Sequence, residues 1–163
     1  EKLQKIRLVY HKGKNKVEPI VKKLLELEKK KKIDQLDTLV QFGKDTYQKR
    51  DLLVKLIKNL KSQGKRIVGY GASGRATVHI NFCKFNSDVV EYVIDASHER
   101  QGRFIPGMHI PIVSPDKLKN DNPDYAILFA YNYFDEVMKK ESSFIKKGGK
   151  FIVPLPEPKI IEP

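Results

Sequence analysis

The stretch RIVGYGASGRATVHI, residues 66–80, combines an apolar run, three glycines and an arginine. The apolar residues predict a short buried strand, and the residues that follow the last glycine predict a helix. Glycines at positions 69, 71 and 74 have the spacing GxGxxG. In open α/β sheets this spacing is typical of a tight strand-to-helix turn that holds a phosphate at the helix N-terminus. The stretch therefore predicts a phosphate-binding loop, although a turn without any ligand has the same pattern.

Each glycine of the loop has an expected task. We expect Gly69 to allow the tight turn, Gly71 to let the backbone approach a ligand, and Gly74 to let helix and strand pack closely. Arg75 adds a planar guanidinium whose geometry suits phosphate. The expected substrate contacts of the loop are Gly69, Gly71, Ala72, Ser73, Gly74 and Arg75.

The chain after residue 65 alternates between apolar runs and helical patterns. Further strands are predicted at 89–95, 109–114, 124–132 and 150–156, and helices at 114–120 and 133–149. Strands that alternate with helices favour parallel pairing through right-handed crossovers. Residues 65–163 are therefore predicted to form a small Rossmann-like α/β domain, with a doubly wound, mainly parallel sheet that binds a nucleotide.

The first 64 residues have a different pattern. A short strand is predicted at 5–13, a helix from Pro19, and a long helix over 34–62 that ends near Gly64. We expect residues 1–64 to pack beside the nucleotide-binding domain as a strand and helical segment.

Polar residues follow two of the predicted strands. Asp95 ends the second strand, where an acid commonly accepts hydrogen bonds from ribose hydroxyls. The loop after it contains Gln101, Arg103 and His109, and Asn132 ends a later strand. His109 suits ligand positioning or a structural role better than general base catalysis, because no carboxylate partner is identifiable. Asn132 suits either contact with a base or sugar, flanked by two tyrosines, or the cap of the next helix.

Charge and composition narrow the partners. The net charge of +12 lies entirely in residues 1–67, which hold 20 Lys or Arg and 8 Asp or Glu. Few aromatic residues accompany it, so a solvated helical surface is favoured and nucleic acid is an unlikely partner. Membrane insertion is not expected, because no run approaches the roughly 18 apolar residues of a span. The single cysteine, Cys83, fits a core position, no disulfide and a cytoplasmic location, and no metal site is expected.

Three ligand classes share the glycine pattern: NAD(P), S-adenosylmethionine (SAM) and other nucleotides. A SAM-binding domain normally has seven strands, more than the five or six predicted here. A dehydrogenase needs a catalytic acid–base set and usually a second domain. An NAD(P)-binding oxidoreductase module remains the alternative, and a nucleic-acid-binding module, supported by the basic first part, is a third hypothesis.

Four segments together resemble the C-terminal domain of SAM-dependent sugar C-methyltransferases, which act on nucleotide-linked deoxysugars. The segments are GKRIVGYGASGRATVHINFC (64–83), VVEYVIDASHERQGRFIPGMHIPIVSPDKL (89–118), NPDYAILFAYNYFDEV (122–137) and GGKFIVPLPEP (148–158). The resemblance runs from about residue 5 to residue 158. It implies a Rossmann-like domain that binds the nucleotide sugar rather than SAM, while upstream zinc-binding and SAM-binding domains belong to the same polypeptide.

The resemblance also implies proton abstraction beside a keto carbon, which gives an enolate that takes the methyl group from SAM. Two departures from the family pattern stand out. The loop has Ser73, Gly74 and Arg75 where the family often has a lysine-containing sequence, and residues 1–4 lack the acid–histidine pair that precedes the first strand. We therefore assign no catalytic residue to this chain and expect it to be inactive alone.

Overall fold

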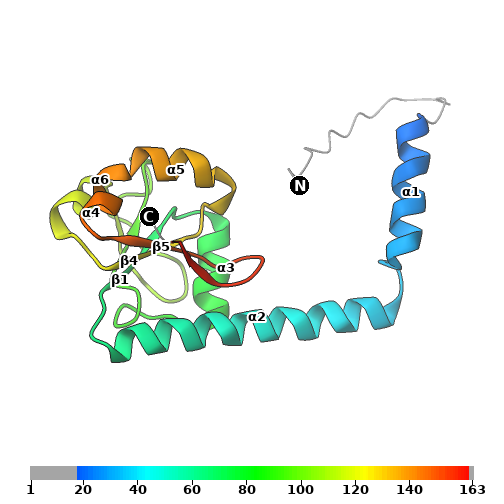
Figure 1. Cartoon of the computed structure of the whole chain (residues 1–163), viewed down its shortest axis with the longest axis horizontal. Helices are drawn as coiled ribbons and strands as arrows, with labels where there is room; N and C mark the ends of the chain where they lie inside the picture. The colour runs from blue at the N-terminus through cyan, green and yellow to red at the C-terminus, as the bar shows by residue number, and fades with distance from the viewer. Residues whose placement is uncertain (1–17, 162–163) are drawn as a thin grey trace. The chain divides into compact units, whose positions relative to one another are not determined.

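The computed structural model describes residues 18–161, whose strands form a six-stranded sheet (Figure 1). The strand order is β3-β2-β1-β4-β5-β6; neighbours are parallel except β6, which is antiparallel to β5. This order is that of doubly wound nucleotide-binding folds and confirms the predicted Rossmann-like α/β class. The strands are β1 (Ile67–Tyr70), β2 (Val93–Ile94), β3 (Ile112–Val113), β4 (Tyr125–Leu128), β5 (Lys150–Val153) and β6 (Lys159–Ile161).

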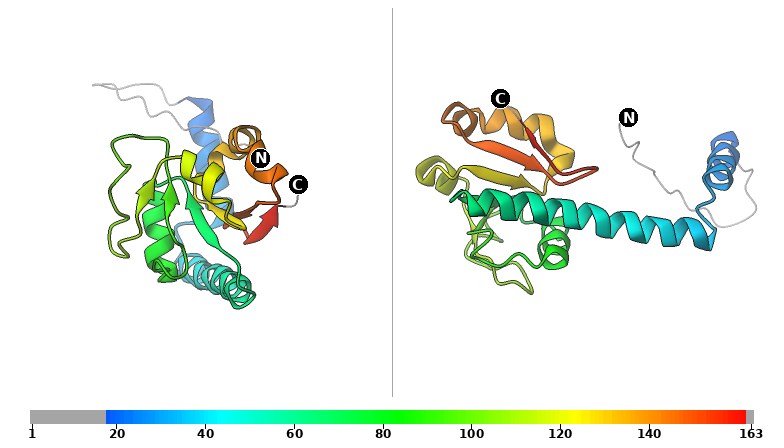
Figure 2. Two further views of the ribbon diagram at one scale, coloured as in Figure 1. Left: turned by 90° about the vertical axis from the view of Figure 1, so that its left-hand side faces the viewer. Right: turned by 60° about the horizontal axis from the view of Figure 1, so that its bottom comes forward.

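Helices cover both faces of the sheet (Figures 1 and 2). Successive side chains of a strand point to opposite faces, so Ile67 packs with α3 (Gly74–Cys83) and the C-terminal half of α2 (Leu36–Ser62). Val68 packs on the other face with α4 (Asp116–Asp121), α5 (Phe134–Lys140) and α6 (Ser142–Lys146). Apolar residues on both faces account for the near-continuous hydrophobicity of the strands.

Cys83 lies in the core on the α3 face, as expected from the sequence. Burial raises the pKa of its thiol to about 11. The thiol is therefore protonated near neutral pH, which does not suit a nucleophile.

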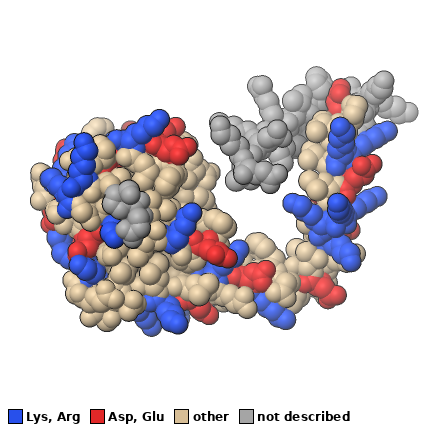
Figure 3. Space-filling model, viewed as in Figure 1, with Lys and Arg blue, Asp and Glu red and all other residues tan. Residues whose placement is uncertain are grey.

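The described chain divides into two compact units after Gly43. The first contains α1 (Pro19–Lys31), whose residues are all exposed, and the start of α2. Figure 3 shows lysines crowded along α1. The second unit begins at Lys44 and includes the part of α2 that packs on the sheet through Leu53, Ile57 and Leu60. The predicted division after residue 64 stays a prediction, and the strand predicted at 5–13 lies outside the described residues.

The single helix predicted over 133–149 is wrong. The segment forms a 3-10 turn, η1 (Tyr131–Tyr133), then α5 and α6, which are separated at Glu141 (φ −99°, ψ 25°). The Glu141 side chain is 3% exposed and accepts a 2.7 Å hydrogen bond from the Tyr70 hydroxyl. A buried carboxylate needs such a partner. Burial, and then this hydrogen bond, raise the pKa of Tyr70 well above its usual value.

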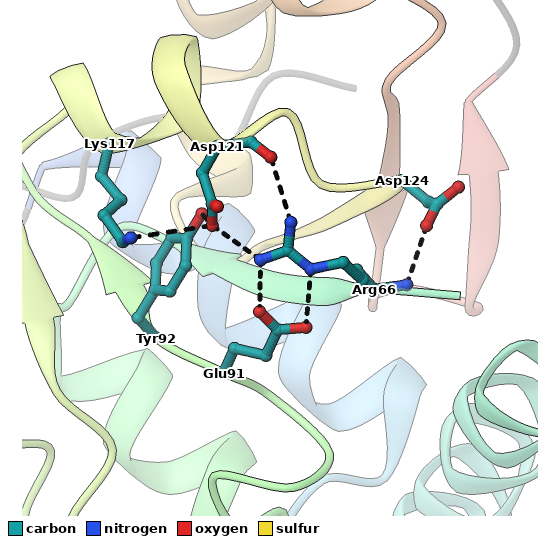
Figure 4. A network of polar contacts seen from close by, with 6 residues as sticks. All are labelled: Arg66, Glu91, Tyr92, Lys117, Asp121 and Asp124. Carbon is teal, nitrogen blue, oxygen red and sulfur yellow. Dashed lines mark hydrogen bonds and ion pairs between the residues drawn. The ribbon is translucent and has the colours of Figure 1, made fainter. Parts of the chain in front are cut away.

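A network of charges ties the amino ends of three strands together (Figure 4). Arg66, just before β1, makes a fork to both oxygens of Glu91 at 3.2 and 2.6 Å. It also donates to the Asp121 carboxylate at 2.7 Å and the Asp121 carbonyl at 3.0 Å. The Tyr92 hydroxyl donates to the same carboxylate at 2.7 Å. Arg66 first, and then Tyr92, hold the pKa of Asp121 below its ordinary value.

Asp124 extends this network to β4. One of its oxygens accepts the backbone N–H of Arg66 at 2.8 Å, and the other accepts the Lys65 ammonium at 3.1 Å. The amino ends of β1 and β4 are thereby held together. These charges are matched within the protein and serve the fold.

Candidate functional site

The candidate site lies where the strand order reverses, between the carboxyl ends of β1 and β4. The chain passes from β1 through α3 to β2 on one side, whereas β4 leads to β5 on the other. In doubly wound sheets this reversal opens a crevice that receives the ligand. The Phe129 N–H donates to the Tyr70 carbonyl at 3.0 Å, which keeps the two strand ends side by side.

Two glycines of the loop are required by their surroundings. Gly71 has φ +90°, and a Cβ there would lie 2.7 Å from the Cβ of Ala130. The turn role predicted for Gly69 is wrong, because Gly69 lies within β1 and its φ is not positive. A Cβ on Gly69 would lie 2.9 Å from side-chain atoms of Phe129 and Val93. Gly71 therefore lets the loop approach the segment after β4.

The packing role predicted for Gly74 is wrong. A Cβ on Gly74 would meet no heavy atom within 4 Å, and its φ is not positive. Gly74 is instead the exposed first residue of α3, so it faces open space. Open space at this position leaves room for a ligand at the helix N-terminus.

The first turn of α3 offers unused hydrogen-bond donors. At the start of this turn, the Thr77 N–H donates to the Ser73 carbonyl at 3.2 Å. The N–H groups of Gly74, Arg75 and Ala76 therefore have no helical acceptor, as at any helix start. The Ser73 hydroxyl oxygen is buried and makes no hydrogen bond to the described residues. Such a group of donors suits an anion.

Arg75 is held by an aromatic ring. Its guanidinium carbon lies 4.9 Å from the ring centroid of Tyr131 in η1. The Tyr131 ring also meets His79 edge-on, at 6.3 Å between centroids. Nδ1 of His79 lies 2.8 Å from the Arg75 carbonyl. No ion pair to Arg75 occurs among the residues 18–161, so its charge has no carboxylate partner there.

Asp95 is engaged by the protein itself. Its Oδ2 accepts the Ala72 N–H at 2.7 Å and lies 3.2 Å from the Arg100 guanidinium. Its Oδ1 accepts the Ser97 N–H at 2.8 Å. Gln101 donates from its amide to the Asp95 carbonyl at 3.0 Å. Asp95 is therefore bound directly to the glycine loop, and Gln101 is bound to Asp95. The polar groups of both side chains contact the protein itself and do not face open space.

The remaining predicted residues lie at different levels of the sheet. Asn132 is exposed in η1, next to the tyrosine that holds Arg75. Arg103 is level with the first residue of β3, because its carbonyl accepts the Ile112 N–H. His109 precedes β3, in the turn of the same hairpin, at φ 53°. Residues before a parallel strand lie toward its amino end, so His109 is not brought to the glycine loop.

Several residues that line this edge are not among the site residues predicted from the sequence. The i, i+4 spacing of Arg75 and His79 is a usable signal, because such residues are neighbours on a helix. Tyr131 is one of the two tyrosines that flank Asn132 in the sequence, and that position alone does not predict its contact with Arg75. The contact of Ala130 with Gly71 joins segments far apart in the chain, and no local pattern reveals it. Arg100, by contrast, is only five positions from Asp95 in the same loop.

Neither a metal-binding cluster nor a membrane-spanning helix occurs within residues 18–161. No group of three or more His, Cys, Asp or Glu side chains within 18–161 is placed to hold a metal ion. None of the helices in this part of the chain is both long and apolar enough to cross a bilayer.

Comparisons with known proteins agree with the geometry. A family model described as the C-methyltransferase C-terminal domain matches residues 5–156. The chain is also 33% identical over 147 residues to the C-methyltransferase NovU of Streptomyces niveus. That match covers 90% of this chain and 35% of the relative, so the chain spans about a third of the relative's length. The chain belongs to the C-methyltransferase C-terminal domain family.

Proposed function

We propose that this chain is the nucleotide-sugar-binding part of a SAM-dependent C-methyltransferase. Family membership supports the reaction class, and the 35% coverage of NovU supports the presence of further domains in the full-length enzyme. We assign SAM and zinc to those upstream domains.

The observation that carries the proposal is the positive charge of Arg75 beside the glycine loop, which has no carboxylate partner among the described residues. Arg75 is held over Tyr131 beside the free N–H groups of the first turn of α3. A guanidinium fork and helix N–H groups together favour a phosphate. A nucleoside diphosphate supplies that anion, and we assign Asn132, exposed in η1 at the same edge, to contact with the sugar or base.

The chemistry requires the sugar to carry a ketone. Loss of the proton from the neighbouring carbon gives an enolate, and that carbon forms a bond to the methyl group as the sulfur–methyl bond of SAM breaks. This chain contributes orientation: it holds the diphosphate so that the sugar projects away from the loop. We assign the proton abstraction to residues outside this chain, and we place the enzyme in the cytoplasm, which suits the single cysteine of these 163 residues.

Calorimetric titration of the 163-residue chain with uridine diphosphate and thymidine diphosphate tests the proposal. We expect at least one to bind and Arg75→Ala to weaken it by about tenfold or more, the size of a lost charge-assisted hydrogen bond. Arg50→Ala is the matched control, because Arg50 also lies 4.9 Å over a tyrosine, Tyr47, but on α2. Equal losses in both variants would contradict the assignment of the site.

Titration with cofactors separates the competing ligand classes. We expect neither SAM nor NAD to bind this chain tightly, and we expect no methyl transfer by the chain alone. Tight NAD binding without nucleoside diphosphate binding would favour the oxidoreductase alternative. SAM binding without nucleotide binding would overturn the proposed division of labour.

A further inference from the structure

Asp95 occupies the position that commonly binds ribose in doubly wound folds, yet its surroundings differ from that use. It ends β2, and its side chain is 10% exposed. An ionised carboxylate accepts at roughly four lone-pair positions. Three are taken here by the Ala72 N–H, the Ser97 N–H and the Arg100 guanidinium, at 2.7, 2.8 and 3.2 Å. Little of the carboxylate is therefore left for two ribose hydroxyls.

The hydrogen bond to Ala72 connects the end of β2 to the glycine loop. Ala72 lies between Gly71, which has φ +90°, and Ser73, the residue that immediately precedes α3. A loop that contains glycine has many accessible backbone conformations. Fixing the Ala72 N–H to a buried carboxylate selects the conformation in which α3 starts at Gly74.

Arg100 makes this arrangement compatible with an anion site. A carboxylate beside a phosphate site repels the ligand unless its charge is compensated. Arg100 supplies a positive charge 3.2 Å from Asp95 Oδ2, and its own side chain is 51% exposed. About half of the Arg100 side chain thus stays exposed to solvent.

We propose that Asp95 is a positioning residue that locks the glycine loop through the Ala72 N–H, with Arg100 as its counter-charge, and that it makes no contact with the ribose of the ligand. The ligand half of this inference rests on the proposed function; the loop half stands on the contacts above.

Amide hydrogen exchange, resolved by residue in the ligand-free 163-residue chain, tests the loop half. In Asp95→Asn and Asp95→Ala we expect the Ala72 amide to exchange about tenfold faster or more, consistent with loss of a charge-assisted hydrogen bond. Core amides such as that of Ile127 should keep their protection. Asp88→Asn is the matched control, because Asp88 is exposed and accepts a hydrogen bond from the Asn86 side chain, away from the glycine loop. Unchanged Ala72 exchange in both Asp95 variants would overturn the inference.

Binding of uridine diphosphate and its 2′,3′-dideoxy analogue tests the ligand half. We expect Asp95→Asn to weaken both ligands by the same factor, so that their affinity ratio matches that of the wild type. A ratio that collapses toward one in the variant would show that Asp95 reads ribose hydroxyls and would overturn the inference. Failure of both ligands to bind the wild type would count against the proposed function, and the exchange experiment would still decide whether Asp95 locks the loop.

Discussion

The two edges of the sheet use arginine in opposite ways. At the amino edge, Arg66 meets two carboxylates, and further contacts from Tyr92 and Lys117 complete the set (Figure 4). At the carboxyl edge, Arg75 rests on the ring of Tyr131 and has no carboxylate partner among the described residues. A matched charge stabilises the fold, whereas a positive charge without a counter-ion is available to an anionic ligand.

The aspartates at the two edges differ in the same way as the arginines. Asp121 and Asp124 at the amino edge bind side chains and N–H groups that hold strands together. Asp95 at the carboxyl edge binds the backbone of the loop and one partly exposed arginine. Substitutions of arginine at the amino edge should therefore change stability, and substitutions of arginine at the carboxyl edge should change ligand binding.

Gly71→Ala should have the largest effect on the carboxyl edge. The new Cβ would lie 2.7 Å from Ala130 Cβ at φ +90°. Left-handed backbone and overpacking together cost about 2–4 kcal/mol, so we expect that loss of unfolding free energy and loss of nucleotide binding. Urea denaturation and calorimetry measure the two effects. Wild-type stability with wild-type affinity in this variant would refute the close approach of the two strand ends.

Arg66→Ala should lower stability and leave nucleotide affinity unchanged. It removes the fork to Glu91 and the bonds to Asp121, and because these groups are partly exposed we expect a loss of about 1–2 kcal/mol. Urea denaturation gives the stability and calorimetry gives the affinity. Arg66→Lys keeps the charge without the fork and should fall between. A variant that binds nucleotide poorly but unfolds like the wild type would break the contrast between the edges.

Acid should remove part of the amino-edge stabilisation. The folded state holds the pKa of Asp121 below its ordinary value of 3.8, chiefly through the hydrogen bond from Arg66. Its contribution is therefore complete above that value and is lost as the pH falls through the lower folded-state pKa. Because the stability contributed by Asp121 depends on its ionisation, we expect the difference in unfolding free energy between wild type and Arg66→Ala to be constant from about pH 5 to 7. The difference should shrink below about pH 4. Urea midpoints across this range measure it, and a gap that widens on acidification would contradict the network.

Gly74→Ala should have the smallest effect on stability. A Cβ at this position meets nothing within 4 Å, and alanine is a better helix residue than glycine, so the change should be within about 0.5 kcal/mol of zero. Thermal unfolding measures it, and Gly71→Ala serves as the contrasting variant. A large loss of stability at Gly74 would show that the predicted helix–strand packing role was right after all.

The fold was predictable because local patterns determine most of it. The glycine loop, the apolar strands and the long helix that ends at Ser62 indicated the parallel sheet and its class. Two elements were not predicted. The break at Glu141 depends on a hydrogen bond to Tyr70, 71 positions away, which leaves no periodic signal in the segment. The short strand β6 depends on antiparallel pairing with β5.

The candidate site was predictable only in outline. The sequence correctly placed Asp95 and Asn132 at the carboxyl edge of the sheet, because strand ends can be located from apolar runs. It misjudged Gly74, whose surroundings depend on how α3 leaves the loop. It also grouped His109 with the ligand edge, because a hairpin within the loop that precedes β3 carries no signature that distinguishes it from an irregular loop.

Amide shifts of the isotope-labelled chain during titration with uridine diphosphate test the central claim most directly. The account predicts the largest shifts at residues 71–76, in the glycine loop and the first turn of α3, with smaller shifts at 130–132. Amides beside Arg66 should not move. Shifts concentrated at the amino edge or on α1, with the glycine loop unchanged, would contradict the claim that the carboxyl edge binds the nucleotide.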